Sequence, residues 1–391
     1  MIRVVEKQEY DQVLELSQYA FQYSLSNDEK EQANSRLQNQ YILGDFEEEK
    51  LTAKLQILSF QVIINETLFK MGGVASVATW PEERRNRKVA KLIDEGLNWM
   101  KENGYHLSYL HPFSIPFYRQ FGYELICSQQ FLTIQKEDLQ FLKKDKGRIQ
   151  REKMEQALPL LKKIYGEFSK SFNSMLVRED LWWENSVIKK DASIVFHYNP
   201  DEKEDGYMIY KVNDRKLTVY EIVTLNEEAK RGFWNFVCQH DSMVDEVKWI
   251  TYEKDFFSFY LANPRVKTEI HPYFMARIID VESFLSLYPF QPSDNEPLIL
   301  HVYDPVASWN NGTYFIENNS VKSFKNTEKG TCVHPPKKGL QIEIGILTAL
   351  LLGYKKPSFL YKAGMIKGDL NDIARLEKII SGNESVLFDF F

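Results

Sequence analysis

Apolar positions in the first third of the chain follow two periods, one helical and one alternating, and their order predicts its elements. Residues 9–21 place apolar side chains towards one side of a predicted helix, and a polar stretch follows at 26–36. The apolar runs 54–65 and 68–80 are separated by a two-residue turn, which is the spacing of a β-hairpin.

A strand-to-helix junction follows the second run. Apolar residues recur at helical intervals from Val89 to Met100, and Asn103 and Gly104 supply a suitable helix end. Residues 105–126 predict a strand, a short helix, a turn at Gly122 and a further strand.

Residues 216–240 repeat this strand-to-helix order, and 222–228 can be aligned with 77–83. Two alternatives explain the match, a duplicated domain or a coincidence of similar α/β rhythm. In a duplicated domain, Ala229 and Lys230 would stand where the first copy has Arg84 and Arg85. The second copy would then have lost the basic pair.

The last hundred residues have a different order of predicted elements, with strands first and helices after them. Strands are predicted at 297–305 and 313–319 with a turn at 310–312, and helices at 341–354 and 370–382. A chain of 391 residues exceeds what one hydrophobic core usually supports. We therefore expect three segments: 1–150, 151–285 and 286–391.

Composition narrows the class of protein. Apolar residues make up 43% and aromatic residues 14%, which is typical of a globular chain. A formal charge of −6 argues against a nucleic-acid-binding protein. The longest apolar stretch, residues 346–354, is too short to cross a bilayer, and the N-terminal residues lack the apolar centre of a signal peptide. We expect a cytoplasmic protein that does not bind membranes.

Cysteine and histidine show no metal-binding spacing. Cys127, Cys238 and Cys332 are far apart and odd in number, which favours reduced thiols over a disulfide framework. The seven histidines have no metal-ligand pattern either. We predict no metal.

The junction after residue 80 is strongly basic, with Arg84, Arg85, Arg87 and Lys88 within five positions. The first turn of a helix has unpaired N–H groups and the positive end of the helix dipole, so it favours an anion. Basic side chains at this place predict a phosphate-binding site. The alternative is a solvated helix face.

This junction, VATWPEERRNRKVAKLI, resembles the acetyl-CoA loop of GNAT N-acetyltransferases, whose Arg-x-x-Gly-x-Gly/Ala signature wraps the cofactor diphosphate. With PFSIPFYRQFGYEL, REDLWWEN, HPYFMARIIDV and the FDFF end, the whole chain is similar to the Eis-like (enhanced intracellular survival) acetyltransferases. The resemblance implies an α/β (α+β) fold: tandem GNAT domains, the second degenerate, followed by a sterol-carrier-protein-like domain.

The chain departs from the GNAT signature at one place, because Arg87 and Val89 stand where glycine and a small residue are usual. A glycine lets backbone approach the phosphate closely. By resemblance Arg84, Arg85, Arg87 and Lys88 would bind acetyl-CoA. Whether the departure weakens this binding stays open.

The resemblance also implies a mechanism. The backbone of Val77 and Thr79 would pair with the pantetheine arm, and the N–H of Val77 would receive charge from the thioester oxygen. Tyr118 would protonate the leaving thiolate as general acid. The C-terminal carboxylate of Phe391 would take the proton from the substrate ammonium. Taken alone, Tyr118 fits a core aromatic residue, and the tail fits one docked for stability.

Relatives act on aminoglycosides, other polyamines or lysine side chains and form hexamers, so the resemblance implies a cationic amine substrate and a homo-oligomer. Asp28 and Asp389 are candidates to hold such a cation. The alternative functions are a protein lysine or N-terminal acetyltransferase and a non-enzymatic lipid carrier or scaffold. The apolar segments 346–354 and 284–290 predict either a lipid tunnel or ordinary core helices.

Overall fold

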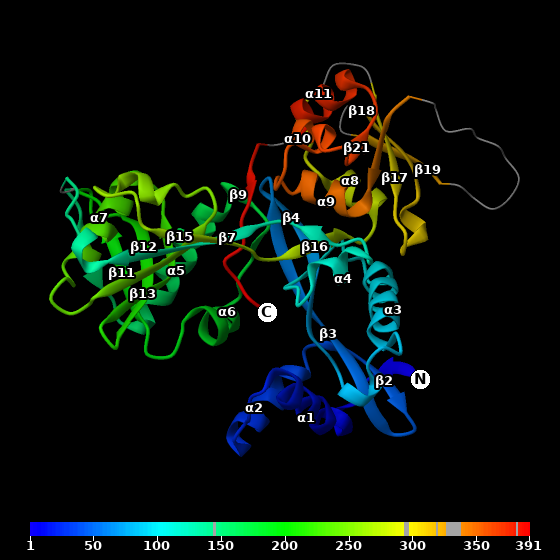
Figure 1. The fold of residues 1–391 in the computed structure, drawn as a ribbon, viewed down its shortest axis with the longest axis horizontal. Coiled ribbons are helices and arrows are strands. Elements are labelled where there is room, and N and C mark those ends of the chain that lie inside the picture. The colour runs from blue at the N-terminus through cyan, green and yellow to red at the C-terminus, as the bar shows by residue number, and fades with distance from the viewer. Residues whose placement is uncertain (144–145, 293–296, 318–319, 326–337, 381) are drawn as a thin grey trace, which may run out of the picture.

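The described residues form three large β-sheets, each packed against helices, and one two-stranded sheet (Figure 1). The computed structural model describes residues 1–391 except 144–145, 293–296, 318–319, 326–337 and 381. Cys332 therefore lies outside the described residues, whereas Cys127 and Cys238 are buried free thiols. Among the described residues, no helix has the length and apolar character needed to cross a membrane.

The first sheet has the strand order β1-β2-β3-β4-β5-β16-β6, and β10 pairs with β3. Its strands are β1 (Ile2–Val4), β2 (Tyr41–Glu47), β3 (Lys50–Ile64), β4 (Thr67–Thr79), β5 (Leu107–Leu110), β6 (Glu124–Leu125), β10 (Met175–Leu176) and β16 (Met275–Ile278). Its helices are α1 (Tyr10–Phe21), α2 (Asn27–Leu37), α3 (Lys88–Glu102) and α4 (Ile115–Arg119). The predicted first helix, β-hairpin and junction helix are thus confirmed.

Helices cover both faces of this sheet. α3 packs on β2, β3 and β4 through Leu92, Ile93 and Leu97, whereas α1 packs on β3 and β4 from the other face. The polar stretch after α1 forms α2, because Ser26 and Glu29 make a reciprocal capping box at its start.

The second sheet has the order β15-β7-β14-β13-β12-β11-β8. Its strands are β7 (Ser128–Gln135), β8 (Arg148–Arg151), β11 (Ser193–Tyr198), β12 (Glu204–Asn213), β13 (Lys216–Thr224), β14 (Glu246–Tyr252) and β15 (Lys267–Pro272). α5 (Met154–Ser169) and α7 (Glu227–Cys238) pack against it, and α6 (Asp180–Trp182) continues into a π-helix (Trp183–Val187). β13 leads into α7 as β4 leads into α3, which is the repeat predicted from the sequence.

The third sheet has the order β19-β18-β17-β20-β21. Its strands are β17 (Leu298–Tyr303), β18 (Gly312–Glu317), β19 (Ser320–Lys325), β20 (Leu340–Glu343) and β21 (Ile366–Lys367), with helices α8 (Val281–Leu287), α9 (Ile344–Leu351), α10 (Pro357–Lys362) and α11 (Leu370–Ile379). The predicted helix 341–354 was wrong at its start, because residues 341–343 pair with β17 as part of β20. α9 is packed into the largest core, which supports the core-helix alternative over a lipid tunnel.

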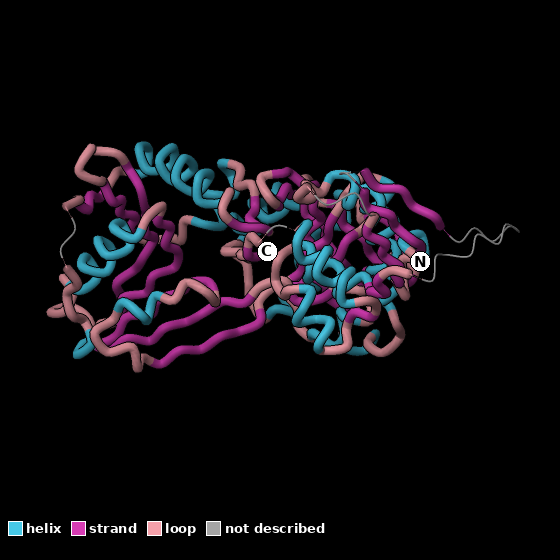
Figure 2. Tube along the Cα trace, turned by 90° about the horizontal axis from the view of Figure 1, so that it is seen from above, coloured by secondary structure: helices cyan, strands magenta, loops and turns pink. Residues whose placement is uncertain are grey.

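Segments far apart in sequence join these sheets. β16, which follows the second sheet along the chain, completes the first sheet between β5 and β6. Near the C-terminus, β22 (Glu384–Ser385) pairs in parallel with β9 (Phe172–Asn173). Figures 1 and 2 both place the C-terminus between the second sheet and the rest of the protein. The domain boundaries near residues 150 and 285 stay predictions.

Candidate active site

A cleft opens where β4 and β5 separate. The two strands pair in parallel only over Met71–Gly73 and Leu107–Tyr109. Within the described ranges, residues 74–79 of β4 have a strand partner only on the β3 side. Their other edge therefore presents backbone groups that a ligand can pair with.

A bulge shapes this edge. The register between β3 and β4 shifts opposite Leu55, and Ser76 adopts a left-handed φ of 50°. Lys54 lies beneath it, fully buried, and its ammonium donates to the Ser76 carbonyl at 2.8 Å and to the Ser76 hydroxyl at 2.6 Å. Burial lowers the pKa of Lys54 to about 7.

The cleft has a volume of about 1560 Å³ and is lined by residues from the first 121 positions of the chain and from the C-terminal part after residue 304. β4 lines it with residues 74–79, the junction before α3 with residues 83–85 and 87–90, and α4 with Phe117 and Tyr118. The segment that follows β17 of the third sheet contributes Pro305 and Val306, and the C-terminal tail contributes Phe390 and Phe391. The predicted cofactor and catalytic residues are therefore brought together.

The arginine junction keeps a glycine-like backbone. Arg85 and Arg87 have φ of 68° and 58°, in the left-handed region where glycine is favoured. Arg87 is the N-cap residue of α3. Arg84, Arg85 and Arg87 are exposed, and none has an ion-pair partner among the residues that the structure describes. The loop thus holds two arginines in a backbone conformation that glycine adopts more readily.

Lys88 differs from these arginines, because its side chain is buried. Its ammonium pairs with Glu47 at 2.5 Å and Glu83 at 3.1 Å and donates to Thr52 at 2.9 Å. Burial alone lowers the pKa of Lys88, but these carboxylates outweigh it and the pKa is raised. Lys88 is therefore better placed to anchor the junction than to hold a diphosphate.

Thr79, at the end of β4, has an orphaned polar group. Its hydroxyl oxygen is buried and has no hydrogen-bond partner among the described residues. Val77 lies two residues earlier on the same cleft edge. A buried hydroxyl without a partner at this position fits a ligand that supplies one.

Tyr118 lies in an aromatic cluster at the cleft, with the rings of Phe113 and Phe117 at 5.3 Å and 5.2 Å. Only 2% of Tyr118 is exposed. Burial, and secondly Tyr123, raises the pKa of the Tyr118 phenol above its usual value. The phenol is therefore protonated at neutral pH and available as a proton donor.

The C-terminal tail is docked through its aromatic rings. The Phe391 ring lies 5.0 Å from Phe60 and 4.9 Å from Phe274. It also covers Gly73 of β4, where a Cβ atom would lie 2.7 Å from a ring carbon. Phe391 thus packs directly on the strand that lines the cleft.

Two further predicted residues do not line this cleft. Asp28 is exposed in the first turn of α2. Asp389 is buried and accepts hydrogen bonds from Arg178 and Trp182. Their contact with a substrate ammonium stays a prediction.

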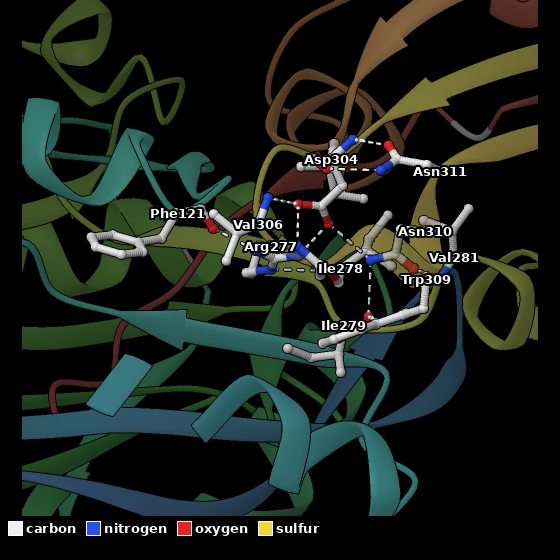
Figure 3. A network of polar contacts seen from close by, with 12 residues as sticks. Phe121, Arg277, Ile278, Ile279, Val281, Asp304, Val306, Trp309, Asn310 and Asn311 are labelled. Carbon is white, nitrogen blue, oxygen red and sulfur yellow. Dashed lines mark hydrogen bonds and ion pairs between the residues drawn. The ribbon is translucent and has the colours of Figure 1, made fainter. Parts of the chain in front are cut away.

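A buried polar network joins the segment after β17 to the turn that follows α4 (Figure 3). Arg277 of β16 forms an ion pair of 2.5 Å with Asp304 and donates to the carbonyl of Phe121, three residues after Tyr118. Asp304 in turn accepts the N–H of Val306 at 3.1 Å. The network therefore fixes two walls of the cleft relative to each other.

Sequence reasoning missed several lining residues. Asp94 of α3 lines the cleft, and burial raises the pKa of its carboxyl group. His111 follows the end of β5, and burial lowers the pKa of its imidazole. A polar residue directly after a strand was a usable signal for His111. Nothing local marks Pro305 and Val306, which reach the cleft only through the packing of the segment after β17.

Family comparisons agree with this geometry. Residues 1–126 match the acetyltransferase (GNAT) domain, and residues 174–278 match a second acetyltransferase (GNAT) domain. The chain is a GNAT-family acetyltransferase. Residues 281–388 match the sterol carrier protein domain, so this acetyltransferase has the Eis-like order of domains. No curated protein sequence matches the chain.

Solved structures share the complete fold of this acetyltransferase. A probable N-acyltransferase from Enterococcus faecalis is 27% identical, with a TM-score of 0.91 over 100% of this chain and 99% of that chain. A GCN5-related N-acetyltransferase from Anabaena variabilis is 21% identical, with a TM-score of 0.85 over the whole of both chains. Eis1 from Mycobacterium abscessus is 19% identical, with a TM-score of 0.81 over the whole of both chains.

Proposed function

We propose that this acetyltransferase transfers the acetyl group of acetyl-CoA to a primary amine of a cationic substrate, an aminoglycoside or a polyamine, by direct transfer. The observation that supports this most is the composition of one cleft, where the arginine junction, the free edge of β4, Tyr118 and Phe391 meet. A cosubstrate that spans this cleft places its diphosphate at the arginine junction and its thioester near Tyr118 and Phe391.

Acetyl-CoA fits the first half of the cleft. GNAT domains use it as cosubstrate, and two segments of this protein, residues 1–126 and 174–278, match such domains. The exposed guanidinium groups of Arg84, Arg85 and Arg87 bind the diphosphate, and the backbone of Val77 and Thr79 pairs with the pantetheine arm. The orphaned hydroxyl of Thr79 supports this placement.

The groups at the other end of the cleft, Phe391 and Tyr118, transfer protons during the reaction. The carboxylate of Phe391 accepts a proton from the substrate ammonium, and the freed nitrogen attacks the thioester carbonyl. The N–H of Val77 donates to the oxygen on which negative charge develops. When the carbon–sulfur bond breaks, Tyr118 donates its proton to the thiolate, and the second proton that leaves the nitrogen restores the phenol.

Carboxylates make the cleft suitable for a cation. Asp94 lies in its wall, and the chain carries a formal charge of −6. Asp28 is proposed as a further, more distant ligand on the basis of its carboxylate and its exposure. A substrate with several ammonium groups can contact more than one of these charges, which favours a polyamine or an aminoglycoside over a single amine.

Thiol release from acetyl-CoA tests the assignment, with aminoglycosides, polyamines and a lysine-containing peptide as acceptors. Tyr118→Phe should lower kcat on the order of 100-fold, since a positioned general acid contributes 10²–10⁴-fold. Tyr105→Phe, a buried tyrosine of the same domain that does not line the cleft, is the matched control.

Residues appended after Phe391 should abolish turnover with every amine, because they remove the free carboxylate. Unchanged turnover of the extended protein would exclude the carboxylate as the base. Stimulation by the peptide alone would favour a protein acetyltransferase instead.

A further inference from the structure

The second acetyltransferase domain repeats the strand geometry that opens the cleft in the first. β13 and β14 pair in parallel over Lys216–Val219 and Glu246–Trp249 and then continue to Thr224 and Tyr252 without further pairing to each other. In the first domain the same separation, between β4 and β5, makes room for the cleft. The question is what occupies this place in the second domain.

The C-terminal tail packs at these diverging strands. Val386 is buried in one core with Tyr207 of β12 and Val223 of β13. The ring of Phe388 lies 6.5 Å from that of Tyr252 at the end of β14 and 5.9 Å from that of Phe168 on α5. The tail thus shares a buried core with β13 and lies beside the end of β14.

A buried charge network fastens the tail there. Arg178 donates through Nε to both oxygens of Asp389, at 2.9 Å and 3.2 Å, and through its two other nitrogens to Glu221 of β13, at 2.8 Å and 2.7 Å. Trp182 donates to Asp389 at 2.7 Å and Tyr207 donates to Glu221 at 2.6 Å. The side chains of Arg178 and Asp389 are each 1% exposed.

The backbone of the same tail residue is also held. The phenol of Tyr273 donates to the carbonyl of Asp389 at 2.9 Å. The guanidinium group of Arg178 lies 4.0 Å above the ring of Tyr165 and 4.6 Å above that of Trp183. Asp389 is therefore bound through both side chain and backbone, by groups that are themselves fixed.

We propose that the second acetyltransferase domain serves as a holder for the C-terminus, and that Arg178 is the positioning residue that sets where Phe390 and Phe391 lie in the first domain's cleft. The inference rests on the proposed function only for the role of the Phe391 carboxylate. Two residues of chain span at most about 7 Å. An anchor at Asp389 therefore restricts the end of the chain to a small volume.

Arginine suits this task for a geometric reason. Its planar fork binds Glu221 with two parallel hydrogen bonds and still directs Nε at Asp389, whereas the single ammonium of lysine cannot reproduce this arrangement. Arg178 also influences the protonation of Asp389, because the two side chains lie in direct contact. Burial raises the pKa of Asp389, while the Arg178 charge opposes that rise and favours the carboxylate that it binds.

Release of the C-terminal residues by carboxypeptidase A measures the hold directly, without any use of activity. In Arg178→Lys and in Asp389→Asn we expect Phe391 and Phe390 to be released roughly tenfold faster or more than from the wild type, since each change weakens charge-assisted hydrogen bonds. Arg215→Met removes an exposed ion pair with Asp245 in the same domain and should leave the release rate unchanged.

Turnover of the same variants separates the two proposals. If the tail is released faster and kcat falls while KM for acetyl-CoA is kept, both the holder and the carboxylate role are supported. Faster release with unchanged kcat supports the holder and excludes the carboxylate as the base. Release at the wild-type rate from folded Arg178→Lys overturns the holder. If Arg178→Lys does not fold, the nearly isosteric Asp389→Asn decides in the same way.

Discussion

An alanine at position 73 should displace the C-terminal residue without changing any polar group of the cleft. A Cβ atom at this position would lie 2.7 Å from one ring carbon of Phe391 and 2.9 Å from the ring of Phe60. Carbon atoms in contact normally lie about 3.5–4.0 Å apart, so the Phe391 ring must move by about 1 Å. A misplacement of about 1 Å can cost on the order of 100-fold in rate. We expect Gly73→Ala to lower kcat by about this factor, with KM for acetyl-CoA nearly unchanged.

Steady-state thiol release at varied acetyl-CoA concentration separates kcat from KM. Gly72→Ala is the matched control, because its Cβ atom would meet Met100 rather than Phe391, and a methionine side chain adapts readily. Thermal unfolding of both variants checks that they are folded. A wild-type kcat in folded Gly73→Ala would refute the argument that the position of Phe391 determines the rate.

Two further variants test charges in and beneath the cofactor site. Burial lowers the pKa of Lys54 from 10.5 to about 7. Between these pH values the unfolded chain binds a proton that the folded protein lacks, so the stability of the wild type rises with pH. The free-energy cost of burying the amine is therefore greatest below about pH 7. The stability advantage of Lys54→Met over the wild type should therefore shrink by about 1.4 kcal/mol per pH unit in urea unfolding between about pH 7 and 9, and a constant difference would contradict this. Arg87→Gly should stabilise the fold by about 1 kcal/mol, by relieving its left-handed backbone, yet weaken acetyl-CoA binding roughly tenfold in calorimetry. Unchanged affinity would show that the guanidinium group does not bind the diphosphate.

Local patterns predicted most of the first domain. The hairpin of β3 and β4 and the helices α1 and α3 follow from side-chain periodicities within a dozen or so residues, which need no knowledge of distant segments. The strand at 341–343 was predicted as helix because its partner, β17, lies some forty residues earlier in the chain. Strand pairing across such a separation overrides the local pattern.

The backbone at the arginine junction shows where local reasoning stops. The sequence shows that Arg87 stands where glycine is usual but leaves its backbone conformation open, and the structure gives it a left-handed φ of 58°. Contacts of Lys88 with Glu47, Glu83 and Thr52 hold the start of α3 against the sheet, and this leaves the loop little choice. A residue that disfavours a conformation can thus be held in it by its neighbours.

The sequence by itself determined the alternation of strands and helices, the repeat of that order, the basic junction and the aromatic chain end, because each depends on residues close together along the chain. Only the tertiary structure decided that Phe391 packs on Gly73, that Arg178 binds Asp389, and that Val306 enters the cleft. Those contacts join segments from all three domains, and they depend on which faces pack together. No pattern along the chain encodes that choice locally.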